Sequence, residues 1–141
     1  MGFMKTTENE LTRTQVNPWT WQDKRGFSQA WQLEGARSLI VVSGQVALDA
    51  DGKPVGTEPA DFEVQARKVF ENLSTVLEAG GASLNDIVKL NVFLTDMSKV
   101  GDYGRIKAEY IKGPQPASTA VGVTALAMPG LMIEVEALAA T

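Results

Sequence analysis

The chain has 141 residues, 44% of them hydrophobic, which is the size and composition of one domain with a substantial core. Its net charge is −4 and its basic residues are dispersed, which argues against nucleic-acid binding, because that function needs a basic surface. Cysteine and histidine are both absent, which excludes disulfides, thiolate nucleophiles, Cys/His zinc sites and a Ser-His-Asp triad. Any acid–base chemistry must therefore use Asp, Glu, Lys, Tyr or water.

The N-terminal residues are polar. We expect residues 1–16 to form a flexible arm and residues 17–141 to form a single domain. Residues 1–15 lack the apolar core of a secretory signal, and no window of the chain holds the roughly 18 apolar residues of a membrane span. These features predict a soluble, cytoplasmic protein that does not associate with membranes.

Two strands are predicted after the arm. Trp19 and Trp21 would face the same side of an extended segment, where they either cover core or subunit surface or form an aromatic wall near a pocket. Residues 27–33 alternate in polarity, and residues 39–46 begin with an apolar, β-branched run. Because a turn sequence at residues 35–37 separates these two runs, we expect them to form a hairpin.

The loop after the second strand contains Asp49, Asp51 and Gly52 at the spacing that opens a calcium-binding loop. Such a loop ends in a glutamate at its twelfth position. That position is Ala60 here, which offers no side-chain oxygen. An ordinary loop without metal is therefore the favoured interpretation.

A long amphipathic helix is predicted from about Thr57 to residue 79. Thr57 is a candidate cap, and Pro59 suits a first helical turn. Gly80 and Gly81 should end the helix through a left-handed cap. The apolar stripe of this helix consists of Phe62, Ala66, Val69, Phe70, Leu73, Val76 and Leu77.

The rest of the chain is predicted to form a strand at residues 87–94, a second helix at 100–112, and strands at 118–125 and 131–138. The order β-β-α-β-α-β-β favours an α+β fold, an α/β sandwich in which one mixed sheet carries both helices on one face. The other face would be a large apolar patch, so we expect a partner subunit to cover it.

An ordered series of motifs resembles the RidA family, also described as YjgF or L-PSP endoribonuclease-like. The motifs occur at residues 26–30 (GFSQA), 42–46 (VSGQV), 65–67 (QAR), 72–73 (NL), 80–89 (GGASLNDIVK), 92–96 (VFLTD), 116–121 (PASTAV) and 133–137 (IEVEA).

The resemblance implies a chorismate-mutase-like fold and a homotrimer with small-molecule clefts between its subunits. It also implies hydrolysis of enamines or imines, such as 2-iminopropanoate, to a keto acid and ammonia, without cofactor or metal. Glu134 would be the catalytic residue and would hold the water. The ligand-binding candidates are Phe27, Ser43, Gly44, Asn91, Ser118, Thr119 and Ala120.

The chain departs from the family pattern at two of these positions. Ser118 stands where the family has an arginine that binds the substrate carboxylate. Phe27 stands where a tyrosine is often found, and the segment between Asp96 and Tyr110 is slightly longer than usual. Lys107 or Arg105 could supply a cation from the second helix, although we interpret both as surface charges.

Three functions are therefore considered. The first is an imine or enamine deaminase with altered substrate preference, and the second is a trimer that binds a small metabolite without turnover. The third is a ribonuclease, which the acidic composition and the absence of histidine disfavour. Serine, threonine and asparagine side chains at the site would suit a neutral polar ligand.

Overall fold

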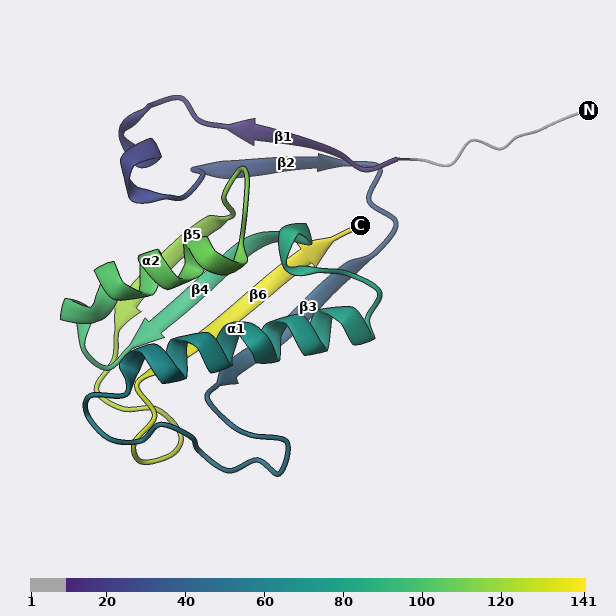
Figure 1. The fold of residues 1–141 in the computed structure, drawn as a ribbon. Coiled ribbons are helices and arrows are strands. Elements are labelled where there is room, and N and C mark those ends of the chain that lie inside the picture. Colours follow the sequence, from purple (N-terminus) through teal and green to yellow (C-terminus); the bar gives the residue numbers. More distant parts are fainter. Residues whose placement is uncertain (1–9) are drawn as a thin grey trace, which may run out of the picture.

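The computed structural model describes residues 10–141 and contains two sheets and two α-helices (Figure 1). Both helices cover the same face of the larger sheet, as predicted. Three short 3-10 helices also occur, at Trp21–Arg25, Leu84–Asp86 and Met97–Lys99. The main elements are β1 (Thr12–Val16), β2 (Ala30–Glu34), β3 (Leu39–Val46), α1 (Phe62–Ala79), β4 (Ile87–Leu94), α2 (Val100–Tyr110), β5 (Ala117–Gly122) and β6 (Ile133–Ala140).

The larger sheet has the strand order β3-β6-β4-β5. Strand β6 runs antiparallel to both β3 and β4, whereas β4 and β5 are parallel. Parallel neighbours cannot be joined by a tight turn and need a crossover connection. Helix α2 is that crossover, which explains why it lies over β4 and β5 (Figure 1).

Strand β4 shows how the sequence pattern selects the buried face. Leu90, Val92 and Leu94 are fully buried towards the helices, and the alternate residues Lys89 and Asn91 lie on the opposite face, as the period of two requires. The prediction of a strand at residues 87–94 is confirmed at both ends.

Helix α1 begins later than predicted. Its first residue is Phe62, so the prediction that Thr57 caps it is wrong. The Asp61 carboxylate accepts a hydrogen bond from the Glu58 backbone nitrogen at 3.2 Å, which closes a turn before the helix. The helix ends as predicted: Gly81, just beyond the helix, has φ 83°, in the left-handed region that favours glycine.

The predicted hairpin between residues 27–33 and 39–46 is wrong. Strand β2 pairs instead with β1, and β3 pairs with β6 in the larger sheet. The chain leaves β2 at Gly35, and the Thr141 carbonyl accepts hydrogen bonds from the backbone nitrogens of Arg37 and Ser38. These bonds direct β3 alongside the C-terminal strand, where it joins a four-stranded sheet, a more stable arrangement than an isolated two-stranded ribbon.

The N-terminal arm was predicted too long, because β1 makes regular antiparallel pairs such as Arg13↔Leu33. The remainder of that prediction, residues 1–9, lies outside the described part of the chain.

The strand geometry assumed for Trp19 and Trp21 is also wrong. Trp21 opens a 3-10 helix and stacks on Trp19 at 6.3 Å between ring centroids.

The C-terminal half follows the predicted order with small shifts. Helix α2 ends at Tyr110 rather than at residue 112. Strand β5 starts one residue early and stops at Gly122, and β6 is displaced by two residues towards the C-terminus. With β1 added at the start, the predicted element order is otherwise the observed one.

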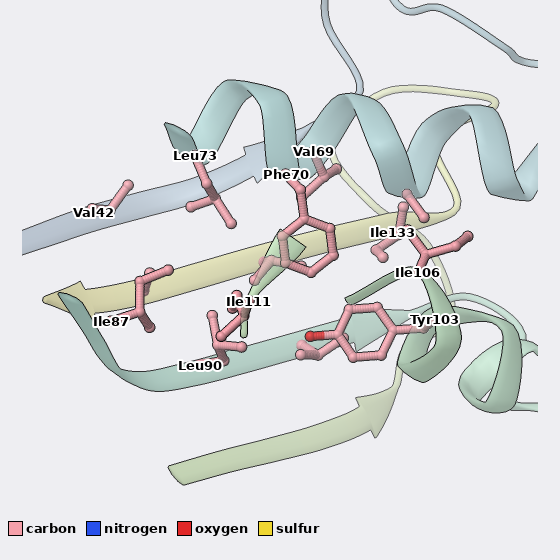
Figure 2. Close-up of a cluster of buried hydrophobic side chains, with 14 of the residues drawn as sticks. Val42, Val69, Phe70, Leu73, Ile87, Leu90, Tyr103, Ile106, Ile111 and Ile133 are labelled. Carbon is pink, nitrogen blue, oxygen red and sulfur yellow. The ribbon is translucent and has the colours of Figure 1, made fainter. Parts of the chain in front are cut away.

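The hydrophobic core lies between the helices and the larger sheet, and its side chains are shown in Figure 2. Phe70 of α1 stacks on Tyr103 and Tyr110 of α2, at centroid distances of 5.9 and 5.2 Å. This aromatic contact joins the two helices above β4. Within residues 10–141, neither helix combines the length and the apolar character needed to cross a membrane.

We expect Phe70→Ala to reduce the free energy of unfolding by about 3–5 kcal/mol, because it removes a fully buried aromatic ring and leaves a cavity. Val76→Ala on the same helix is the control, since Val76 is 38% exposed although the sequence placed it in the apolar stripe. Urea denaturation at equilibrium measures both values. Similar losses for the two variants would contradict the assigned core.

Candidate functional site

A pocket opens between helix α2 and strand β5, with a volume of about 770 Å³. Small residues on both elements create it. A Cβ atom added at Gly101 or Gly104 would meet no atom within 4 Å, so α2 leaves open space above β5. The facing residues of β5, Ser118 and Ala120, are also small and line the pocket together with Phe27. Three of the predicted ligand-binding residues therefore lie together here.

The segment that carries Phe27 is attached to the main domain on both sides of that residue. The Lys107 amine donates a hydrogen bond to the Gly26 carbonyl at 2.6 Å. On the other side, the Ser28 hydroxyl donates to the Gln115 carbonyl, also at 2.6 Å. The Trp21 ring packs edge-on against Phe27 at 5.8 Å between centroids. These contacts position the Phe27 ring as one wall of the pocket.

Lys107 is not the surface charge predicted from the sequence. Only 6% of its surface is exposed, and it lines the pocket. Burial lowers the pKa of the Lys107 amine, because desolvation disfavours the ammonium form. Arg105 does lie on the surface, where it pairs with Glu63 at 2.7 Å and Asp102 at 3.4 Å. The two residues therefore have different roles although they are two positions apart.

Two buried polar atoms next to the pocket have no hydrogen-bond partner among residues 10–141. They are the Tyr103 hydroxyl and the Gln115 side-chain oxygen. Burial raises the pKa of Tyr103, so this phenol stays protonated at neutral pH. Figure 2 shows its ring among the core side chains. Tyr103 and Gln115 both line the pocket, and neither was selected from the sequence.

A second group of predicted site residues lies on the opposite face of the sheet. Asn91 of β4 stands next to Thr119 of β5, and the Thr119 hydroxyl accepts a hydrogen bond from the Lys89 amine at 2.9 Å. The Asn91 amide donates to Glu136 of β6 at 3.3 Å. Glu134 is two residues before Glu136 and shares its face. Lys89 is a polar group of this face that sequence reasoning did not select.

Glu134 lies directly over Gly44. The pairing of β3 with β6 shifts register between Val42 and Gln45, so Ser43 and Gly44 form an irregularity in β3. A Cβ atom at Gly44 would come within 2.7 Å of the Glu134 side-chain carboxyl carbon. Glycine is thus required at this position if the carboxylate is to keep its place. The structure therefore brings together Gly44 and Glu134, two predicted site residues that are 90 positions apart in the sequence.

The predicted site residues therefore form two groups. Glu134 does not line the pocket that contains Ser118, because alternation along the strands directs the two side chains to opposite faces. Exposed apolar side chains occur on the face of Glu134, where Leu39 is 59% and Val41 is 82% exposed.

The described residues hold no group of three or more acidic side chains placed to bind a metal ion. In the loop that resembles the start of a calcium site, one Asp49 carboxylate oxygen accepts hydrogen bonds from the backbone nitrogens of Asp51 and Lys53, both at 2.9 Å. This bonding is typical of an ordinary turn.

Comparisons with known proteins agree with the fold. The family model described as Endoribonuclease L-PSP matches residues 22–141. Protein HMF1 of Saccharomyces cerevisiae is 38% identical over 73% of this chain and 77% of its own length. A Mus musculus protein named 2-iminobutanoate/2-iminopropanoate deaminase is 37% identical over 80% of this chain and 79% of its own.

The solved structures include a Yersinia pestis protein of the conserved Rid family, whose function is described as unknown. It superimposes with a TM-score of 0.80 and is 32% identical, covering 92% of this chain and 98% of its own. The arrangement of two helices on a mixed sheet is thus shared with that family.

We expect Gly44→Ala to displace the Glu134 carboxylate. The displacement should cost about 0.5–1.5 kcal/mol, the range for a side chain forced from its preferred rotamer. In a double-mutant cycle with Glu134→Ala, the two substitutions should show a coupling free energy of that size, measured by urea denaturation. Additive effects would show that the two residues are not in contact.

Proposed function

Because the chain belongs to the Endoribonuclease L-PSP family and resembles solved structures of RidA and YjgF-family proteins, we propose that it hydrolyses small reactive imines or enamines as a homotrimer. The observation that carries the proposal is the placement of Glu134 over Gly44, beside a row of polar side chains on one sheet face. The mouse relative named as an iminobutanoate/iminopropanoate deaminase supports the same reaction class.

The uncovered sheet face supports the assembly. Val41 and Leu39 point away from both helices and are largely exposed. A face of this kind is stabilised when further copies of the chain cover it. Three copies in a closed ring satisfy this need through one repeated contact. Such a ring also places the polar groups around Glu134 next to a neighbouring chain.

Assembly would also unite the two groups of site residues. In one chain, the pocket with Ser118 and the face with Glu134 are separated by the thickness of the sheet. A cleft between neighbouring chains can draw Ser118 from one copy and Glu134 from the next. The proposed site is therefore complete only in the oligomer.

The chemistry needs one positioned water. The carbon of an imine is electrophilic, so water adds to it once its proton has a base to accept it. Glu134 is that base: it takes a proton from water as the C–O bond forms and the C=N π electrons move to nitrogen, and it then returns this proton to the nitrogen, which gives a carbinolamine. Glu134 next takes the hydroxyl proton and passes it to the amino nitrogen, so that the C–N bond breaks, ammonia leaves and a carbonyl product remains. Asn91 and Thr119 lie on the same face and can orient the substrate.

Substrate preference should differ from that of the deaminases that have the arginine. Ser118 cannot form the bidentate, charge-assisted pair that a guanidinium makes with a carboxylate. This loss also favours a second candidate function, a trimer that binds a small metabolite without turnover. Hydrolysis of RNA is not proposed, because the chain is acidic and lacks histidine.

We expect the purified protein to accelerate the decay of 2-iminopropanoate generated by an amino-acid oxidase, followed by absorbance. Glu134→Gln should lower the rate at least about a hundredfold, the usual minimum for loss of a general base. Glu109→Gln is the matched control, because Glu109 pairs with Arg67 on the helical surface. No acceleration by the wild-type chain, and none by Ser118→Arg, would favour the non-catalytic binding protein.

The trimer is tested separately. Val41→Lys should convert the trimer to monomers, since it places a charge in the proposed interface, while leaving the fold intact because Val41 is 82% exposed in one chain. Light scattering coupled to gel filtration measures the mass, and circular dichroism checks the fold. A wild-type mass other than that of three chains would remove both the trimer and the shared cleft.

A further inference from the structure

The pocket between α2 and β5 is cationic although the chain is acidic. Lys24, Arg25 and Lys107 line it, and none of its lining residues is Asp or Glu. The chain as a whole has 17 acidic and 13 basic residues, so the charge of this pocket is opposite in sign to the net charge of the chain. A pocket lined by charges of one sign attracts ligands of the opposite sign.

Lys107 is the buried member of this group. Its ammonium can donate three hydrogen bonds, and within residues 10–141 it donates one, to the Gly26 carbonyl. It makes no ion pair with any described carboxylate, unlike Arg67 and Arg105. A buried ammonium is normally compensated by an anion. Among the described residues of one chain, the remaining donors of Lys107 therefore have no anionic partner.

The pocket gives a ligand room next to this amine. Gly101, Gly104 and Lys107 follow one another at intervals of three residues, so they share one side of α2. Neither glycine has a side chain, and no neighbouring atom lies within 4 Å of the position that a Cβ atom would take at either residue. The other walls are mainly apolar and include Phe27, Val100 and Ala120. A ligand with one anionic group and a short apolar body matches these surfaces.

We propose that Lys107 anchors the carboxylate of a small monocarboxylic acid in this pocket, a task that Ser118 cannot perform. The inference rests on the proposed function in so far as the pocket is part of the same site. Burial lowers the pKa of Lys107, and a bound carboxylate raises it again, because an adjacent anion stabilises the ammonium. Lys24 and Arg25, both exposed, increase the local concentration of anions near the pocket.

The test compares butanoate with butanamide, a neutral molecule of nearly the same shape. Calorimetric titration of the full chain at constant ionic strength should show at least tenfold tighter binding of butanoate. Lys107→Met should abolish that preference, and Lys107→Arg should retain most of it. Lys112→Met is the matched control and should bind as the wild type does, since its amine is exposed and bonds the Ala108 carbonyl. Equal binding of the two probes by the wild type would overturn the proposal.

Lys107 also supports the fold through Gly26, so a second variant separates ligand binding from stability. Gly104→Leu fills the open space beside α2 and leaves the Lys107–Gly26 bond in place. It should fold at least as well as the wild type, because leucine favours helix over glycine, and it should not bind butanoate. Binding at wild-type strength in this variant would place the anion elsewhere and contradict the proposal.

The imine assay distinguishes failure of this inference from failure of the proposed function. Turnover with the same KM in the wild type and in Lys107→Met would leave the hydrolase intact and remove the anchor. Butanoate binding that depends on Lys107, without any turnover of the imine, would support the anchor and remove the proposed hydrolase activity. If both hold, Lys107→Met should raise KM at least tenfold and change kcat much less, since a carboxylate anchor acts mainly on binding.

Discussion

The parallel pairing of β4 with β5 is the constraint on which the rest of the site depends. Parallel strands need a crossover, so α2 must lie across the face of this pair. The register sets Ser118 beside Leu90 and Ala120 beside Val92. Since Leu90 and Val92 face the helices, Ser118 and Ala120 face them too. A slip of one residue in this pairing would move both out of the pocket and turn Thr119 inwards.

Much of the fold follows from local patterns. Strand β4 and the end of α1 could be predicted because strict alternation and a glycine pair leave few alternatives. The strand that pairs with β2 could not be predicted, because the choice between β1 and β3 depends on where the C-terminal strand lies. The start of α1 was missed because Thr57 is a plausible cap in isolation, whereas the chain first makes a turn that the Asp61 carboxylate closes with the Glu58 nitrogen, and the helix begins after it.

The sequence predicted which residues belong to the candidate site better than it predicted how they are arranged in space. The motifs selected Glu134 and Gly44, and the structure places them in contact. The division of the set between two faces depends on strand register, which the sequence does not specify. Lys107 was expected at the surface because lysine is rarely buried without a partner, and its partner here, the backbone carbonyl of Gly26, leaves no signature in the sequence.

The wall of the pocket that carries Phe27 belongs to the segment between β1 and β2, outside the four-stranded sheet. Its links to the main domain near the pocket include individual hydrogen bonds at Gly26 and Ser28 and a single backbone bridge between Ser28 and Ala117. Segments attached in this way can open locally while the core stays folded. Ligand selection and fold stability can therefore evolve separately. Substitutions in this segment can change which molecules enter the pocket and how fast they leave, without loss of the sheet that holds Glu134.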